Sequence, residues 1–183
     1  MDPMCGGGTI VIEAAMMARK IPPGYFRFAK REYPNLKLFP YEQWQPIIAK
    51  ANDEIRWDYK CEIWARDIDP NAIKSARENA LLAGVQDCIK FETKDARLLH
   101  QENLSGLVVT NPPFGIRLGK KMEIPYLYTD FLKSAATAGI QRIVLTSPRN
   151  IKNIPPCYEL SRTFSFIYGR FTTHIFRFDI CGR

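Results

Sequence analysis

Asp2-Pro3-Met4-Cys5-Gly6-Gly7-Gly8-Thr9 is a glycine-rich turn placed directly before a helical pattern, and it decides the fold class of this chain of 183 residues. Apolar residues recur from Ile10 to Ala18 at helical spacing, so the turn lies at the amino end of a helix. Glycines let the backbone approach a ligand closely, and amides at a helix start supply hydrogen-bond donors. Alone, the turn fits a dinucleotide binder or a plain tight turn equally well.

Two later segments that are predicted to form strands each end in a carboxylate residue. Asp67 follows residues 62–66, and Asp95 ends the pattern that starts at Phe91. A carboxylate in the position of Asp67 can accept both ribose hydroxyls of an adenosine-containing cofactor, and Asp95 is placed to meet an adenine amine. The gap from Gly8 to Asp67 far exceeds the roughly 20 residues of a compact dinucleotide fold, which predicts an insertion at residues 20–60.

Each carboxylate also has a plainer interpretation. Asp67 could cap the helix that begins near Pro70, although Asp69 is the better candidate for that cap. Asp95 could be a solvated loop carboxylate, because only its position supports a role in binding. We therefore assign the ribose to Asp67 and the helix cap to Asp69.

Asn111-Pro112-Pro113-Phe114 follows the apolar run 107–110 and suits methylation of a planar exocyclic amine. The Asn111 side-chain oxygen and the Pro112 carbonyl can accept both amine protons, which draws the nitrogen lone pair out of conjugation. The prolines fix these acceptors in advance, and Phe114 can stack on a base swung out of its helix. The turn, Asp67, Asp95 and Asn111 occur in the order expected when successive strand ends line one crevice.

The rest of the chain alternates predicted helices and strands. Helices are predicted at residues 9–19, 41–53, 70–83 and 125–138, and strands at 62–66, 89–93, 107–111 and 142–146. Residues 163–168 and 173–180 alternate apolar and polar side chains, which predicts an antiparallel hairpin. The pattern predicts an α/β, Rossmann-like fold with a mostly parallel sheet and helices on both faces. We expect the loop 22–40 to lie over the carboxyl edge of the sheet.

Composition favours a polyanionic partner and excludes several other classes. The net charge is +7, and no apolar run reaches the roughly 20 residues of a membrane span. Five scattered cysteines and two histidines lack metal-ligand spacing, which predicts reduced cytosolic thiols and no metal site. In the insertion, basic residues interleave with aromatic ones that could pack or stack on bases: Arg19, Lys20, Arg27, Lys30, Arg31 and Lys37 with Tyr25, Phe26, Phe28, Tyr33 and Phe39.

The chain resembles the S-adenosylmethionine-dependent RNA guanine methyltransferases that carry an upstream THUMP RNA-binding domain. The family includes archaeal tRNA and bacterial large-subunit rRNA enzymes that methylate the guanine 2-amino group. The motifs that carry the resemblance are Asp-Pro-Met-Cys-Gly-x-Gly-Thr at 2–9, Ile-Pro-Pro-Gly at 21–24, Asp-Ile-Asp-Pro at 67–70 and Thr-Asn-Pro-Pro-Phe-Gly-Ile-Arg-Leu-Gly at 110–119. Residues 119–128 are closer to the archaeal tRNA branch.

The resemblance implies a class I methyltransferase fold, S-adenosyl-L-methionine as cofactor and structured RNA (tRNA or rRNA) as partner. It implies a cofactor site formed by Asp2, Pro3, Cys5, Gly6, Gly8, Thr9, Asp67, Ile68, Asp95, Ala96 and Asn111. Catalysis is assigned to Asn111, Pro112 and Phe114, and RNA contacts to Pro113, Arg117, Lys120 and Lys121. We expect a cytoplasmic RNA guanine-N2 methyltransferase that favours tRNA and needs no catalytic His or Cys.

Family members carry an apolar strand and the THUMP region ahead of the glycine turn, whereas Met1 here directly precedes Asp2. Residues 1–183 are therefore expected to form the catalytic domain without most of its central first strand. Three alternatives stay open. A 23S rRNA enzyme shares the motifs, a DNA adenine or protein glutamine methyltransferase would share Asn-Pro-Pro-Phe, and a clipped chain could be a non-catalytic RNA-binding fragment.

Overall fold

The structure is a computed structural model that describes residues 1–26, 41–114, 124–168 and 171–181. Its helices are α1 (Thr9–Ala18), α3 (Tyr41–Asp53), α4 (Pro70–Leu82) and α5 (Ile124–Ala138), with 3-10 turns η1 (Gln86–Cys88) and η2 (Ala96–Gln101). Its strands are β1 (Ile63–Asp67), β2 (Ile89–Thr93), β3 (Leu107–Thr110), β4 (Arg142–Ser147), β5 (Tyr158–Tyr168) and β6 (Phe171–Ile180). This order confirms the predicted α/β fold with a terminal hairpin.

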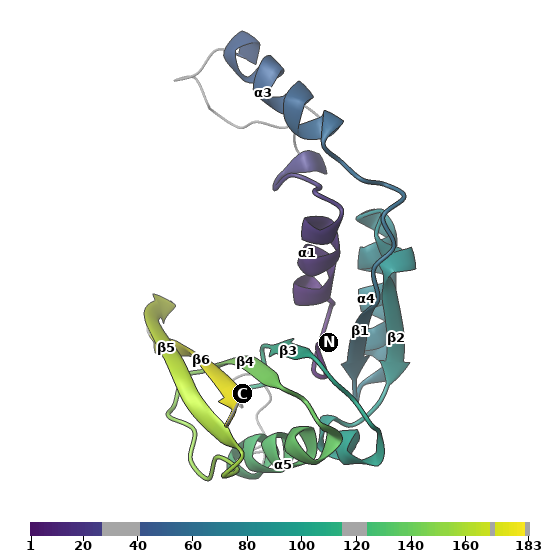
Figure 1. Ribbon diagram of the computed structural model, residues 1–183. Helices are drawn as coiled ribbons and strands as arrows, with labels where there is room; N and C mark the ends of the chain where they lie inside the picture. Colours follow the sequence, from purple (N-terminus) through teal and green to yellow (C-terminus); the bar gives the residue numbers. More distant parts are fainter. Residues whose placement is uncertain (27–40, 115–123, 169–170, 182–183) are drawn as a thin grey trace.

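The strands form two sheets that are joined by the first two residues of the chain (Figure 1). β1 and β2 are parallel, and the second sheet has the order β3-β4-β6-β5, with β3 and β4 parallel and β6 antiparallel to both neighbours. The Asp2 amide donates to the Trp64 carbonyl at 2.8 Å, and the Asp2 carbonyl accepts the Arg66 amide at 2.8 Å. On the other side, the Met1 amino group donates to the Leu107 carbonyl at 2.9 Å. Met1 and Asp2 thus occupy the central position between β1 and β3.

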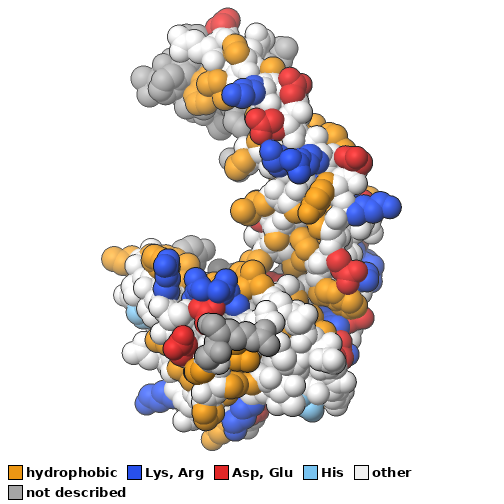
Figure 2. All heavy atoms as spheres, in the orientation of Figure 1, with side chains coloured by type: hydrophobic (Ala, Val, Ile, Leu, Met, Phe, Trp, Pro, Cys, Tyr) orange, Lys and Arg blue, Asp and Glu red, His pale blue; other side chains and the backbone are white. Residues whose placement is uncertain are grey.

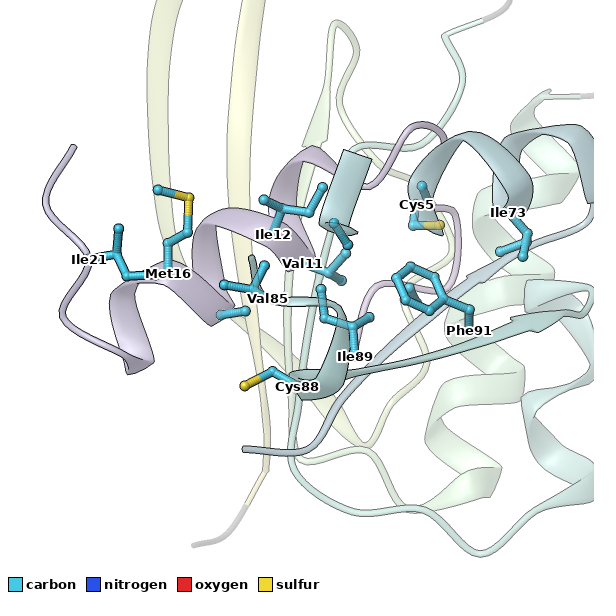
Figure 3. Close-up of a cluster of buried hydrophobic side chains, with 14 residues drawn as sticks. Cys5, Val11, Ile12, Met16, Ile21, Ile73, Val85, Cys88, Ile89 and Phe91 are labelled. Atoms are coloured by element: carbon cyan, nitrogen blue, oxygen red, sulfur yellow. The ribbon is translucent and has the colours of Figure 1, made fainter. Parts of the chain in front are cut away.

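Each sheet has its own hydrophobic core. In the first core, α1 and α4 pack on β1 and β2, and Figure 3 shows Val11, Ile12 and Phe91 turned toward one another there. The second core lies between α5, η2 and the four-stranded sheet, around Phe131 and Phe178. Both residues are fully buried. The hydrophobic core is therefore divided into two parts, one for each sheet.

The insertion leaves the fold at the edge opposite to the one that we expected. Residues 22–26 lie beside the segment that leads into the amino end of β1, where the rings of Tyr25 and Trp57 are 5.7 Å apart. The Arg56 amide also donates to the Arg19 carbonyl at 2.8 Å. The expectation that loop 22–40 covers the carboxyl edge is therefore wrong for its described part, because α1 carries the chain back to the amino edge. Residues 27–40 lie outside the described residues, and α3 follows at the far end of the molecule (Figure 1).

Arg19 has a structural role rather than a place on a basic surface. Its side chain is 3% exposed and donates to the carbonyls of Tyr59 and Gly84 at 3.2 and 2.9 Å. It also forms an ion pair with Asp87 at 2.5 Å. Arg19 therefore ties the end of α1 to the turns before β1 and β2, and its buried charge is not part of the exposed basic residues of the insertion.

The terminal hairpin is longer than its alternation predicts. β5 begins at Tyr158, five positions before the predicted start, and its pairing with β6 shifts between Leu160 and Arg162. Such a shift breaks the two-residue alternation on which the prediction rests. The Tyr158 hydroxyl donates to the Ile140 carbonyl at 2.6 Å and anchors this start in the second core.

The surface in Figure 2 carries Lys and Arg side chains near α3 and around the β5–β6 hairpin, interspersed with carboxylates. Among the described residues on this face, Lys and Arg therefore form no continuous basic track. In the described part of the chain, no helix is long and apolar enough to cross a membrane.

Candidate active site

The glycine turn is held open at the amino end of α1. Gly8 stands at the N-cap with φ 86°, and a Cβ there would lie 3.0 Å from the Cβ of Ala76 in α4, so a side chain at this position would be both strained and crowded. Asn79 of α4 donates from Nδ2 to the Gly7 carbonyl at 2.9 Å. Among the described residues no side chain caps this helix start, so its first-turn amides stay available to a ligand. Sequence reasoning assigned no role to Asn79.

Asp67 connects the end of β1 to this turn. Its Oδ2 accepts the Gly6 amide at 2.9 Å, and its Oδ1 accepts the Asp69 amide at 3.0 Å. Each carboxylate oxygen has a second lone pair, so two further donors such as ribose hydroxyls can still be accepted. Asp69 caps α4 by accepting the Asn71 amide at 2.9 Å, which confirms the predicted division of roles. Ile68, between the two carboxylates, is 63% exposed at the same edge.

Asp2 and Cys5 lie beneath the turn rather than on its surface. The Asp2 side chain is 1% exposed, and its Oδ1 accepts the Met4 amide at 3.1 Å. Burial is the main cause that raises the pKa of Asp2 to about 6, and the nearby Asp67 charge contributes in the same direction. Burial likewise raises the pKa of the Cys5 thiol to about 12, which keeps it protonated and unreactive. These two side chains shape the turn, with Pro3 buried between them.

Asp95 is engaged by its own neighbour. It caps η2 by accepting the Arg97 amide at 2.9 Å and pairs with the Arg97 guanidinium at 2.5 Å. The hydrogen bonds from the Arg97 side chain lower the pKa of Asp95, so the group is a carboxylate at neutral pH. Ala96, next to it, is buried. An adenine amine at Asp95 would share the carboxylate with Arg97, and this contact stays a prediction.

Asn111 lies one residue beyond β3. Its side chain is exposed and its Oδ1 accepts a hydrogen bond from the Thr146 hydroxyl at the end of β4. Pro112 is buried, whereas Pro113 and Phe114 are half-buried. The predicted substrate residues Arg117, Lys120 and Lys121 lie outside the described residues. Sequence reasoning missed Thr146, which the pairing of β3 with β4 brings beside Asn111.

The parallel arrangement brings these groups to one edge. β1 and β2 run parallel, Asp2 bridges Ala65 in parallel, and β3 is parallel to β4. The carboxyl ends that carry Asp67, Asp95 and Asn111 therefore face the same side of the fold. The glycine turn rises from Asp2, between β1 and β3, so it stands between Asp67 and Asn111. Within the described ranges, no three His, Cys, Asp or Glu side chains are grouped to hold a metal ion.

A glycine turn, a carboxylate on the next strand and Asn-Pro-Pro-Phe at the same carboxyl edge of an α/β sheet define a class I methyltransferase fold. Residues 1–163 match the RMKL-like methyltransferase domain, and the chain belongs to this family.

The chain is also similar to individual proteins. The chain is 36% identical over 187 aligned positions to the tRNA (guanine(6)-N2)-methyltransferase of Methanocaldococcus jannaschii, covering 96% of this chain and 47% of the relative. It is 40% identical over 136 positions to the ribosomal RNA large subunit methyltransferase K/L of Vibrio campbellii, covering 72% and 19%. A solved structure of SMU.472, described as a methyltransferase complexed with SAH, superposes with a TM-score of 0.78 at 20% identity, over 100% of this chain and 48% of that one. This chain spans less than half the length of these proteins.

Proposed function

We propose that this chain is the catalytic domain of an S-adenosylmethionine-dependent RNA methyltransferase that modifies the 2-amino group of a guanine, with tRNA favoured as substrate. The observation that carries the proposal is the position of Asn111 and Pro112 beside the edge where the glycine turn meets Asp67. Relatives named for tRNA guanine-N2 and large-subunit rRNA methylation support the same class of substrate.

The turn and Asp67 fit an S-adenosylmethionine molecule. The uncapped first-turn amides of α1 suit the carboxylate at the methionine end, and the free lone pairs of Asp67 suit the ribose hydroxyls. The remaining residues that we assign to the cofactor are those that the family resemblance implies: Asp2, Pro3, Cys5, Gly6, Gly8, Thr9, Ile68, Asp95, Ala96 and Asn111. Asp2 and Cys5 act by shaping the turn, because both side chains are buried.

The cofactor supplies a methyl group bonded to a positively charged sulfur. Asn111 Oδ1 and the Pro112 carbonyl accept hydrogen bonds from the two N–H groups of the guanine amine and aim its lone pair along one line. Phe114 stacks on the ring, and the flanking Pro113 limits its freedom. As the N–C bond formed, the S–C bond would break and leave a neutral thioether, and the amine would then release its extra proton to water. Because the amine becomes cationic only as the N–C bond forms, positioning and desolvation carry the rate effect and no strong general base is needed.

We extend the proposal to the cellular context. The partner is structured RNA in the cytoplasm, with Arg117, Lys120 and Lys121 on its phosphates. Phosphate contacts position a strand without reading its sequence, so selection of one guanine requires an RNA-recognition module such as a THUMP domain in addition to residues 1–183. The insertion at residues 20–60 is part of the catalytic domain.

The test measures transfer of an isotopically labelled methyl group from S-adenosylmethionine to tRNA, to large-subunit rRNA, to duplex DNA and to protein. Nucleosides from the labelled RNA are then identified by mass spectrometry. We expect N2-methylguanosine, with more label in tRNA than in rRNA. Label in DNA adenine or protein glutamine overturns the proposal, and cofactor binding without any transfer supports a non-catalytic RNA-binding role instead.

A further inference from the structure

We propose that Thr146 is a positioning residue that fixes the orientation of the Asn111 side-chain amide for methyl transfer. The inference rests on the proposed function, because it assigns to Thr146 an effect on the reaction through Asn111. Thr146 itself need not contact the substrate or the cofactor.

The strand register places the two residues side by side. Thr110 of β3 pairs with Leu145 of β4, so the next positions along the two parallel strands are Asn111 and Thr146. The Thr146 hydroxyl donates to Asn111 Oδ1. The following residue, Ser147, is buried and bonds instead to the backbone of Arg149 at 2.7 and 3.1 Å. Thr146 is thus the hydroxyl at this strand end that reaches Asn111.

An exposed amide needs such a contact to hold one orientation. Asn111 lies beyond the last paired residue of β3, and its side chain is exposed. The Thr146 hydroxyl uses one lone pair of Oδ1, which leaves the second lone pair for an amine proton. Thr146 is itself held in the antiparallel ladder of β4 with β6, where it pairs with Ile175. A rigid strand therefore sets the direction of an acceptor that would otherwise rotate.

The kinetic test compares Thr146→Val, which keeps the shape and removes the hydroxyl, with Thr146→Ser, which keeps the hydroxyl. Misplacement of a catalytic group by about 1 Å can cost about 100-fold, so we expect Thr146→Val to lower the single-turnover rate by about 10- to 100-fold. Thr146→Ser should retain near-normal rates, and the dissociation constants for cofactor and RNA should be unchanged in both. Thr163→Val is the matched control, because Thr163 is an exposed threonine of β5 at the far side of the same sheet.

A double-mutant cycle separates positioning from general damage to the fold. In an Asn111→Ala background, Thr146→Val should cause no further loss of rate, because the group that it orients is already absent. Equal losses in the two backgrounds overturn the proposal. So does a normal single-turnover rate in Thr146→Val.

An NMR measurement tests the contact between Thr146 and Asn111 without any substrate. The side-chain amide of Asn111 gives a nitrogen–proton NMR signal pair that is assigned by its disappearance in Asn111→Ala. We expect this pair to shift and to show faster motion in Thr146→Val, and to stay unchanged in Thr163→Val. An Asn111 signal unaffected by Thr146→Val overturns the inference. If the wild-type chain methylates no RNA guanine, the proposed function fails, and this signal then decides the Thr146 contact by itself.

Discussion

The carboxylate of Asp67 accepts the amide of Gly6 at 2.9 Å, although the two residues are 61 positions apart in the chain. The bond joins the end of β1 to the glycine turn and places a negative charge against the backbone that we assign to the cofactor. The geometry of the turn and the charge at the strand end are therefore set by one residue.

We predict that Asp67→Ala weakens S-adenosylmethionine binding by about 1.5–3 kcal/mol, the scale of hydrogen bonds to a charged group. Isothermal titration calorimetry measures the affinity, and circular dichroism confirms that the variant is folded. Asp69→Ala is the control, because loss of the α4 cap should lower stability by roughly 0.5–2 kcal/mol and leave cofactor affinity near normal. Equal cofactor affinity in folded Asp67→Ala and wild type would remove Asp67 from the site.

Asn111→Ala should abolish most turnover and leave cofactor binding nearly intact. The side chain is exposed at the end of β3, so its removal leaves no buried group unpaired. Loss of one preorganised polar contact to the transition state typically costs about 100- to 1000-fold in rate. Rapid-quench single-turnover assays measure this directly, and a rate within a few-fold of wild type contradicts the role of Asn111.

Because Asp2 is buried, we predict that Asp2→Asn raises the free energy of unfolding by an amount that depends on pH. Burial raises the folded-state pKa of Asp2 to about 6, above its ordinary value of 3.8, so the folded protein binds the proton more tightly than the unfolded chain. Ionisation of Asp2 therefore costs stability, progressively as the pH rises from about 4 to 6 and fully above that range. Asp2→Asn avoids this cost and keeps an acceptor for the Met4 amide.

Urea unfolding of the two proteins between pH 4 and pH 8 tests this prediction. The advantage of Asp2→Asn should be small at pH 4 and approach about 3 kcal/mol above pH 6, from about 2 pKa units at 1.36 kcal/mol each. Parallel stability curves for the two proteins over this range would show that Asp2 is not the titrating group.

An engineered extension of about six β-forming residues ahead of Met1 should raise the free energy of unfolding. Met1 and Asp2 already bond to β1 on one side and to β3 on the other, so an extension in the same direction can pair with both. At roughly 0.5–1.5 kcal/mol for each hydrogen bond, a few such bonds contribute about 2–4 kcal/mol. Thermal and urea unfolding compare the protein that carries the β-forming extension with one that carries a Gly-Pro extension of equal length. Equal stability of these two proteins contradicts the prediction.

Local chemistry made much of the fold predictable from the sequence. Asp69 before Pro70 is a cap followed by a first-turn proline, and α4 begins at that proline. The strand that ends in Asp67 and the apolar run before Asn111 lie within one residue of their predicted bounds. These signals depend on neighbouring residues, so no knowledge of the tertiary structure was needed.

The missed features depend on contacts between distant segments. Arg19 looks like any basic residue after a helix, and its burial follows from carbonyls 40 and 65 positions away. The shift between Leu160 and Arg162 hides the start of β5 from an alternation argument. Thr146 gains its meaning only from the register of β4 against β3. The roles of the cofactor and substrate residues stay predictions for the same reason.

The junction between the two cores has a consequence for the dynamics of the protein. Among the described residues, the halves meet through the backbone of Met1 and Asp2 and through Glu102, which pairs with Arg66 at 2.8 Å and with Lys94 at 2.5 Å. Because this seam between the two halves is narrow, each half can open as its own cooperative unit. Amide hydrogen exchange should then give different opening free energies for β2 and β4. The glycine turn and Asp67 lie on one side of the seam, with Asn111 on the other. A molecule bound by both sides would hold the two halves together. Protection of backbone amides against hydrogen exchange should therefore rise in both halves when it binds.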